Sequence, residues 1–161
     1  MHNFQQIVTL RKQRTERARR NEAHARQELE KSSAAVIEAK KAVEAFREET
    51  KTLEWDLLKR LIGHAVTIND LLDVEVQLKA AQKKAQELVD KVTVCKNTEQ
   101  EDKQRLEQRR AFRVAATLKL NKSEEMESEF AAERRREQTF AEDALMDEFS
   151  EMAFNRQRSG A

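Results

Sequence analysis

The sequence predicts an all-α fold, in which two long helices form an antiparallel coiled-coil hairpin and the second helix overhangs the first. The 161 residues include no proline and only two glycines, and 38% of them are charged, so little in the composition interrupts a helix. Apolar residues recur at the heptad spacing of a coiled-coil seam on both sides of one short break, at residues 62–68. Hydrophobic residues make up 39% of the chain and many are alanine, which suits a narrow seam better than a wide core. We therefore expect a single helical hairpin domain spanning residues 1–161.

The first helix is expected from about residue 3 to residue 61. Its a positions are Val8, Thr15, Glu22, Leu29, Val36, Val43, Thr50 and Leu57, and its d positions are Phe4, Arg11, Ala18, Ala25, Ser32, Ala39, Phe46 and Leu53. The apolar stripe is continuous from Ala25 to Leu57 and weaker before Ala25. A helix of this length needs a partner helix that covers its stripe.

The turn is expected at residues 62–68. Gly63 supplies the conformational freedom that lets the chain leave the first helix. Thr67, followed three residues later by Asp70, has the form of a capping box at the start of a new helix. The chain therefore reverses direction here.

The second helix is expected from about residue 68 to residue 154, followed by a frayed tail at residues 155–161. Its a positions are Leu71, Leu78, Ala85, Val92, Glu99, Leu106, Arg113 and Leu120, and its d positions are Val74, Ala81, Leu88, Cys95, Asp102, Arg109, Ala116 and Ser123. In an antiparallel pair, residues that face each other then have numbers that add to about 131. This register places Val43 opposite Leu88 and Phe46 opposite Ala85, and it leaves the end of the second helix without a partner.

Two apolar groups lie outside the predicted seam. Leu145, Phe149 and Met152 share one face of the overhanging segment, where the end could curl back, pair with a second copy or dock on another protein. Trp55, Leu58 and Ile62 lie near the turn. Trp55 either wraps over the turn or serves as an anchor for a partner.

Charge is distributed unevenly along the chain, although the formal net charge is only +1. Residues 1–31 carry 8 basic and 4 acidic side chains, whereas residues 124–154 carry 3 basic and 11 acidic ones. Either these runs are solvated helix faces, or the two ends bind different partners. The register predicts one basic patch made of Arg11, Lys12, Arg14, Arg17, Arg19, Arg20, Arg109, Arg110 and Arg113. An acidic protein surface is the favoured partner of this patch, because the chain as a whole is near neutral and no aromatic residue for base stacking is interleaved with the basic residues from Arg11 to Arg20.

Several kinds of chemistry have no residues to support them. The two glycines cannot form a phosphate-binding loop, and His2, His24 and His64 have no second ligand at metal spacing. We therefore expect no catalytic residues, no cofactor and no metal, and hence no enzyme. Cys95 is expected to pack as a small apolar side chain. Without an apolar run that could insert into a membrane or serve as a signal peptide, we expect a cytoplasmic protein.

Three segments resemble the YscO family of type III secretion proteins, which is related to the flagellar export protein FliJ. The first is Ile7-Val8-Thr9-Leu10-Arg11-Lys12-Gln13-Arg14 with Glu16 and Arg17, the second is Phe46-Arg47-Glu48-Glu49, and the third is the Glu-rich segment from Glu133 to Glu151. The resemblance implies a two-helix antiparallel stalk, similar in shape to the central γ subunit of rotary ATPases. Such a stalk would sit in a hexameric secretion ATPase and link it to the membrane protein of the export gate. It also implies a peripheral location at the cytoplasmic face of the apparatus and the handling of translocator chaperones.

Two other functions remain open at this point. One is a coiled-coil scaffold that self-associates through the stripe around Phe149. The other, which we favour less, is a helical hairpin that binds nucleic acid. For the stalk we expect no nucleic-acid partner and a monomeric free state.

Overall fold

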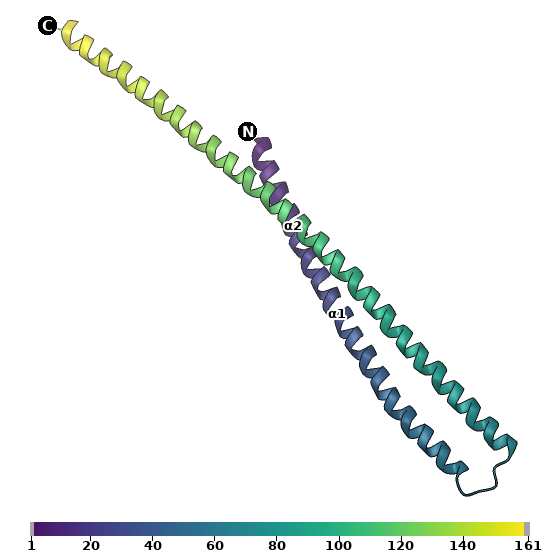
Figure 1. Cartoon of the computed structure of the whole chain (residues 1–161). Coiled ribbons are helices and arrows are strands. Elements are labelled where there is room, and N and C mark those ends of the chain that lie inside the picture. Colours follow the sequence, from purple (N-terminus) through teal and green to yellow (C-terminus); the bar gives the residue numbers. More distant parts are fainter. Residues whose placement is uncertain (1, 160–161) are drawn as a thin grey trace. The chain divides into compact units, whose positions relative to one another are not determined.

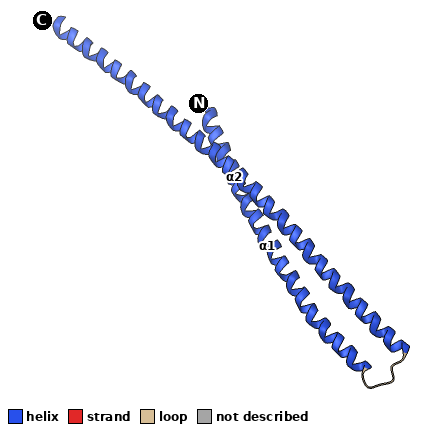
Figure 2. Ribbon diagram, viewed as in Figure 1, coloured by secondary structure: helices blue, strands red, loops and turns tan. Residues whose placement is uncertain are grey.

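The computed structural model describes the backbone of residues 2–159 and the side chains of residues 4–159. It contains two α-helices, α1 (His2–Leu61) and α2 (Ile68–Ser159), and no strand in the described part of the chain. Figure 1 and Figure 2 show α2 returning alongside α1 after the turn, so the two helices are antiparallel. The predicted all-α helical hairpin is confirmed.

Helix α2 ends at Ser159, five residues beyond the predicted end at residue 154. The prediction of a frayed tail is therefore wrong for residues 155–159, and residues 160–161 lie outside the described part. No proline or glycine interrupts α2 before Gly160. Arg156 and Arg158 in the last turn also favour the helix, because their charges complement the negative end of its dipole.

The contacts between residues divide the chain into two compact units. The sequence predicted a single domain. The hairpin unit is Arg20–Ala111, and the end unit consists of the described parts of Met1–Arg19 and Phe112–Ala161. Each unit contains a piece of both helices, and each is described below by itself.

The turn joins the helices within the hairpin unit. Gly63 has a φ of 92°, a conformation that glycine adopts without the steric cost of a Cβ. Thr67 precedes α2 and forms a reciprocal cap with Asp70. The Thr67 N–H donates to Asp70 Oδ2 at 2.9 Å, and the Asp70 N–H donates to Thr67 Oγ1 at 3.3 Å. The predicted capping box is confirmed.

Replacing Thr67 with alanine should destabilise the first turn of α2 by about 1 kcal/mol, because the Asp70 N–H loses its acceptor. The hydrogen bonds from Thr67 also lower the pKa of the Asp70 carboxyl. A lowered pKa in the folded state means that this stabilisation is present above the unfolded-state pKa and is lost as the pH falls through the folded-state pKa. The protection factors of the Asp70 and Leu71 amides, which correct exchange rates for the slower intrinsic exchange in acid, should therefore fall as the pH is lowered. In Thr67→Ala they should be low already at neutral pH. Thr67→Ser is the control that keeps the hydroxyl, and equal exchange in Thr67→Ala and the wild type would contradict the role of the cap.

The core of the hairpin unit follows the predicted seam. Its buried residues are Glu22, Ala25, Ser32, Val36, Ala39, Leu57, Ala81 and Asp102, and all of them occupy predicted a or d positions. Across the seam, the Ser33 hydroxyl donates to Glu99 Oε1 at 2.8 Å, which lowers the pKa of Glu99. Val43 and Phe46 line a common surface pocket with Ala85 and Leu88, as the predicted register requires.

Two predicted seam residues of the hairpin unit are exposed instead. Leu71 is 52% exposed, and Arg109 is exposed as well. The register places Leu71 opposite Arg60, which is exposed as well, instead of opposite an apolar residue of the seam. Arg109 itself keeps its guanidinium solvated, which costs less than burying it.

The core of the end unit is small and partly polar. Its buried residues are Val8, Thr15, Ala18 and Ser123, again at predicted a and d positions. The Thr15 hydroxyl lies 3.3 Å from the Ala116 carbonyl oxygen of α2, a pair that matches the predicted register. Arg11 donates to the Lys119 carbonyl oxygen at 2.9 Å and also to the Ser123 hydroxyl. Hydrogen bonds therefore supplement the weak apolar stripe in this unit.

Candidate interaction surfaces

The first surface is apolar and surrounds the turn of the hairpin unit; we call it the tip surface. The predicted members Trp55, Leu58 and Ile62 are all exposed, Trp55 by 61% and Ile62 by 73%. The Lys59 ammonium lies 5.5 Å from the centroid of the Trp55 ring. An exposed tryptophan beside exposed aliphatic side chains is the composition of a binding hot spot, which favours the anchor interpretation of Trp55.

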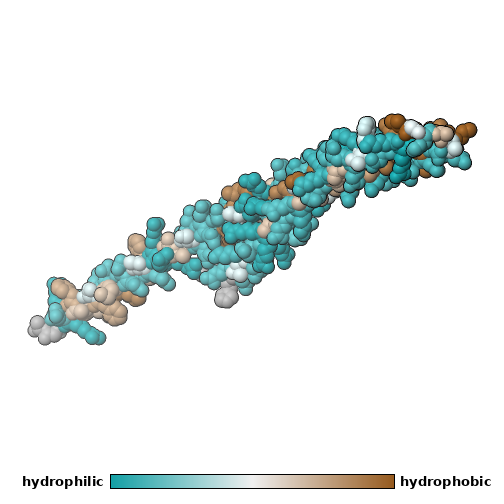
Figure 3. Space-filling model, turned by 90° about the horizontal axis from the view of Figure 1, so that it is seen from below, coloured by the Kyte–Doolittle hydropathy of each residue, from teal (hydrophilic) through white to brown (hydrophobic). Residues whose placement is uncertain are grey.

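The structure enlarges the tip surface with residues that the sequence analysis missed. These are Val66, Ile68, Leu72 and Val76, all exposed. Figure 3 shows the most hydrophobic side chains gathered at the end of the hairpin unit that holds the turn. The spacing of Ile68, Leu72 and Val76 at every fourth residue was the available signal, because it predicts a second apolar stripe on the helix outside the seam.

The second surface is the basic segment, and its predicted members have different environments. Lys12, Arg14, Arg17 and Arg19 are exposed in the end unit, where Arg11 and Arg113 are half-buried. Arg20, Arg109 and Arg110 are exposed in the hairpin unit. Lys12 pairs with Glu124 at 3.2 Å, and Arg19 pairs with Glu16 at 3.6 Å. Both pairs are solvent-exposed and contribute little to stability.

A pocket of about 450 Å³ in the end unit collects part of this positive charge. It is lined by Arg11, Arg14, Phe112, Ala115, Ala116, Lys119, Lys122 and Met126. Half of these side chains are cationic, half are apolar, and none is acidic. We call this pocket the basic groove. Lys119 and Lys122 were missed from the sequence, although the predicted register places Lys119 opposite Lys12.

The third surface is the C-terminal stripe of Leu145, Phe149 and Met152. All three are exposed, Phe149 by 64%, and every described residue from 133 to 159 is exposed. The stripe lies on a continuous helix, so the chain does not curl back within the described residues up to Ser159. The described overhang therefore leaves this apolar face open to water.

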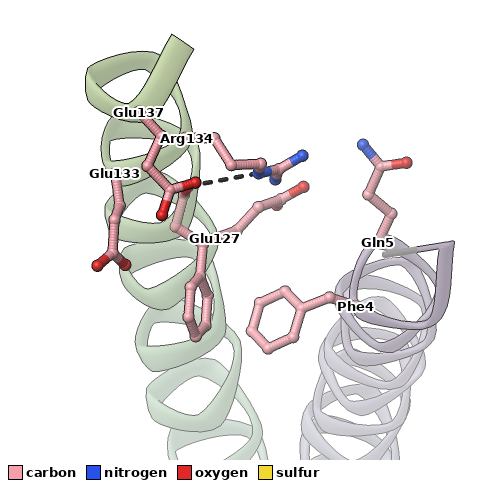
Figure 4. A pocket seen from close by; sticks show the side chains of 7 residues that line it. Phe4, Gln5, Glu127, Glu133, Arg134 and Glu137 are labelled. Atoms are coloured by element: carbon pink, nitrogen blue, oxygen red, sulfur yellow. Dashed lines mark hydrogen bonds between the residues drawn. The ribbon is translucent and has the colours of Figure 1, made fainter. Parts of the chain in front are cut away.

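A second pocket of the end unit, of about 500 Å³, lies where the N-terminal part of α1 meets α2. Figure 4 shows the Phe4 ring pointing from α1 toward α2. The Phe4 ring packs edge-to-face on Phe130 of α2, with ring centroids 5.7 Å apart. Phe4 and Glu127, which the register places side by side, both line this pocket. The aromatic pair closes the end of the seam.

Comparisons with protein-family models, with curated proteins and with solved structures gave no match. The part of the chain that the structure describes contains no helix that is long and apolar enough to cross a membrane. Within residues 2–159 no group of three or more His, Cys, Asp or Glu side chains is placed to hold a metal ion.

Proposed function

We propose that this protein is a non-enzymatic stalk or adaptor of a type III secretion export apparatus, which links the secretion ATPase to the export gate and handles translocator chaperones. The observation that carries the proposal is the two-helix antiparallel hairpin, combined with the resemblance to the YscO family described above. All buried side chains of the described chain lie on one narrow seam, so most of the surface is free for partners.

The basic segment is the proposed contact with the secretion ATPase. Arg14, Arg17 and Arg20 are exposed on α1 and lie outside the a and d positions, so they can contact an acidic protein surface without disturbing the seam. Long, exposed basic side chains accelerate association with an acidic partner more than they stabilise the fold. This assigns recognition of the ATPase to charge and leaves the apolar surfaces for other contacts.

Binding to a purified hexameric secretion ATPase tests the proposal. Arg14→Glu, Arg17→Glu and Arg20→Glu combined should weaken binding by about tenfold or more, because each like-charge contact is repulsive. The matched control reverses three exposed lysines of α2, Lys83→Glu, Lys91→Glu and Lys96→Glu, with the same change in net charge. Circular dichroism should show unchanged helicity in both variants. Equal binding by the arginine variant and the wild type would refute the ATPase contact.

The tip surface is the proposed contact with the export gate. Trp55→Ala, Leu58→Ala and Ile62→Ala combined should abolish capture of the cytoplasmic part of the export-gate protein, because they remove exposed anchors. The same variant should bind the ATPase normally. If the tip variant lost ATPase binding and kept gate binding, the assignment of the two ends would be reversed.

A further inference from the structure

The basic groove of the end unit combines apolar and cationic side chains. Its apolar lining consists of Phe112, which is 62% exposed, with Ala115, Ala116 and Met126. Its cationic lining consists of Arg11, Arg14, Lys119 and Lys122, and no carboxylate lines it. Apolar side chains next to cations favour an amphipathic helix whose polar edges are negative.

The overhang of α2 has this chemistry. Residues 137–154 contain six acidic side chains and no lysine or arginine. Glu142 and Glu148 lie three residues before and three residues after Leu145, so they flank the stripe of Leu145, Phe149 and Met152. The chain itself therefore contains a helical segment with an apolar stripe and acidic flanks, the chemistry that the groove favours.

The overhang of one molecule cannot reach its own groove. Helix α2 is continuous from Ile68 to Ser159. Lys119 in the groove and Leu145 in the stripe are separated by ~39 Å along the helix axis at 1.5 Å per residue. Because the stripe and the α2 residues of the groove belong to one uninterrupted helix, only a second molecule can bring stripe and groove together.

We propose that two copies of this chain associate by placing the acidic overhang of one copy in the basic groove of the other. In this arrangement the stripe side chains cover Phe112 and Met126, and Glu142 and Glu148 face the cations that line the groove. This differs from the monomeric free state expected from the sequence, and it does not depend on the proposed role in secretion.

Sedimentation velocity of the full chain over a range of concentrations tests the association. The wild type should form a dimer or larger species. The affinity of this association should fall when the ionic strength is raised from about 0.05 M to about 0.5 M, because salt screens the attraction between the charges. Lys119→Glu with Lys122→Glu should raise the dissociation constant by about tenfold or more, and so should Glu142→Lys with Glu148→Lys. All four side chains are exposed, and circular dichroism should confirm that both variants keep their helicity.

Mixing the two variants identifies the contact. The groove variant retains a wild-type overhang, and the overhang variant retains a wild-type groove, so an equimolar mixture should regain a hetero-association that neither variant shows alone. Combining all four substitutions in one chain should restore self-association with the charges exchanged. A matched control, Lys83→Glu with Lys91→Glu, should associate like the wild type.

Three results would overturn the proposal. The first is a wild-type chain that is monomeric at every concentration and salt condition. The second is a groove variant that associates as well as the wild type, which would indicate pairing of stripe against stripe. The third is a mixture of the two variants that stays dissociated. Since none of these measurements involves the ATPase or the export gate, failure here is distinguishable from failure of the proposed function.

Discussion

Replacing Leu57 with alanine is expected to lower the free energy of unfolding by about 2–4 kcal/mol. Leu57 is only 3% exposed and is the largest apolar side chain among the buried residues of the hairpin unit. The truncation removes buried methyl groups and leaves a cavity beside the turn, where two helices held by a narrow seam have few other contacts to compensate. Urea unfolding followed by circular dichroism would measure the change.

The adjacent Leu58 is the matched control. Leu58 is 53% exposed, so Leu58→Ala makes the same chemical change one residue away without creating a cavity. Its effect on the free energy of unfolding should stay within about 0.5 kcal/mol. If both variants lost the same stability, the seam would not pass through Leu57, and the heptad assignment near the turn would be wrong.

Replacing Asp102 with leucine is expected to stabilise the chain by about 1–2 kcal/mol. Asp102 occupies a d position, is only 7% exposed, and faces Leu29 in the predicted register. Its ion pair with Arg105 spans 3.3 Å, and the Arg105 side chain is 56% exposed, so the arginine can return to water when the carboxylate is removed. Leucine at this position would replace a partly desolvated charge with apolar contact across the seam.

Thermal and urea unfolding would measure this increase, with Glu101→Leu as the control. Glu101 precedes Asp102 on α2 but is exposed, so leucine there should change the free energy of unfolding by less than about 0.5 kcal/mol. A loss of stability in Asp102→Leu would show that the carboxylate has contacts in the seam that outweigh its desolvation. A gain of stability together with a changed oligomeric state would indicate that the charge also restricts which helices pair.

The elements and their register were predictable because they depend on local chemistry. Gly63 and the Thr67–Asp70 cap mark the turn, and the seven-residue spacing from Val8 to Ser123 marks the seam on both helices. The end of α2 was predicted less well, because fraying was assumed where the composition contains no helix breaker before Gly160.

The surfaces beside the seam were only partly predictable. The sequence indicated the N-terminal arginines of α1 and the apolar side chains at Trp55 and Phe149. All of these are exposed except Arg11, which is half-buried. It did not indicate Lys119 and Lys122, because a groove depends on how side chains from two helices flank the line of contact. The sequence also placed Leu71 in the seam, although the burial of a seam residue depends on which side chain of the opposite helix lies against it.

The sequence by itself determined that this chain forms two helices, where they are joined and which residues of one helix face those of the other. These features follow from helix propensity, capping and a repeat of seven residues, which act over a few turns of chain. Only the tertiary structure decided which seam residues lose their water, that Arg11 bonds across to Ser123, and that four cations and four apolar side chains line one groove in the end unit. Burial and grooves depend on side chains that are distant in the sequence and meet only when the two helices pack.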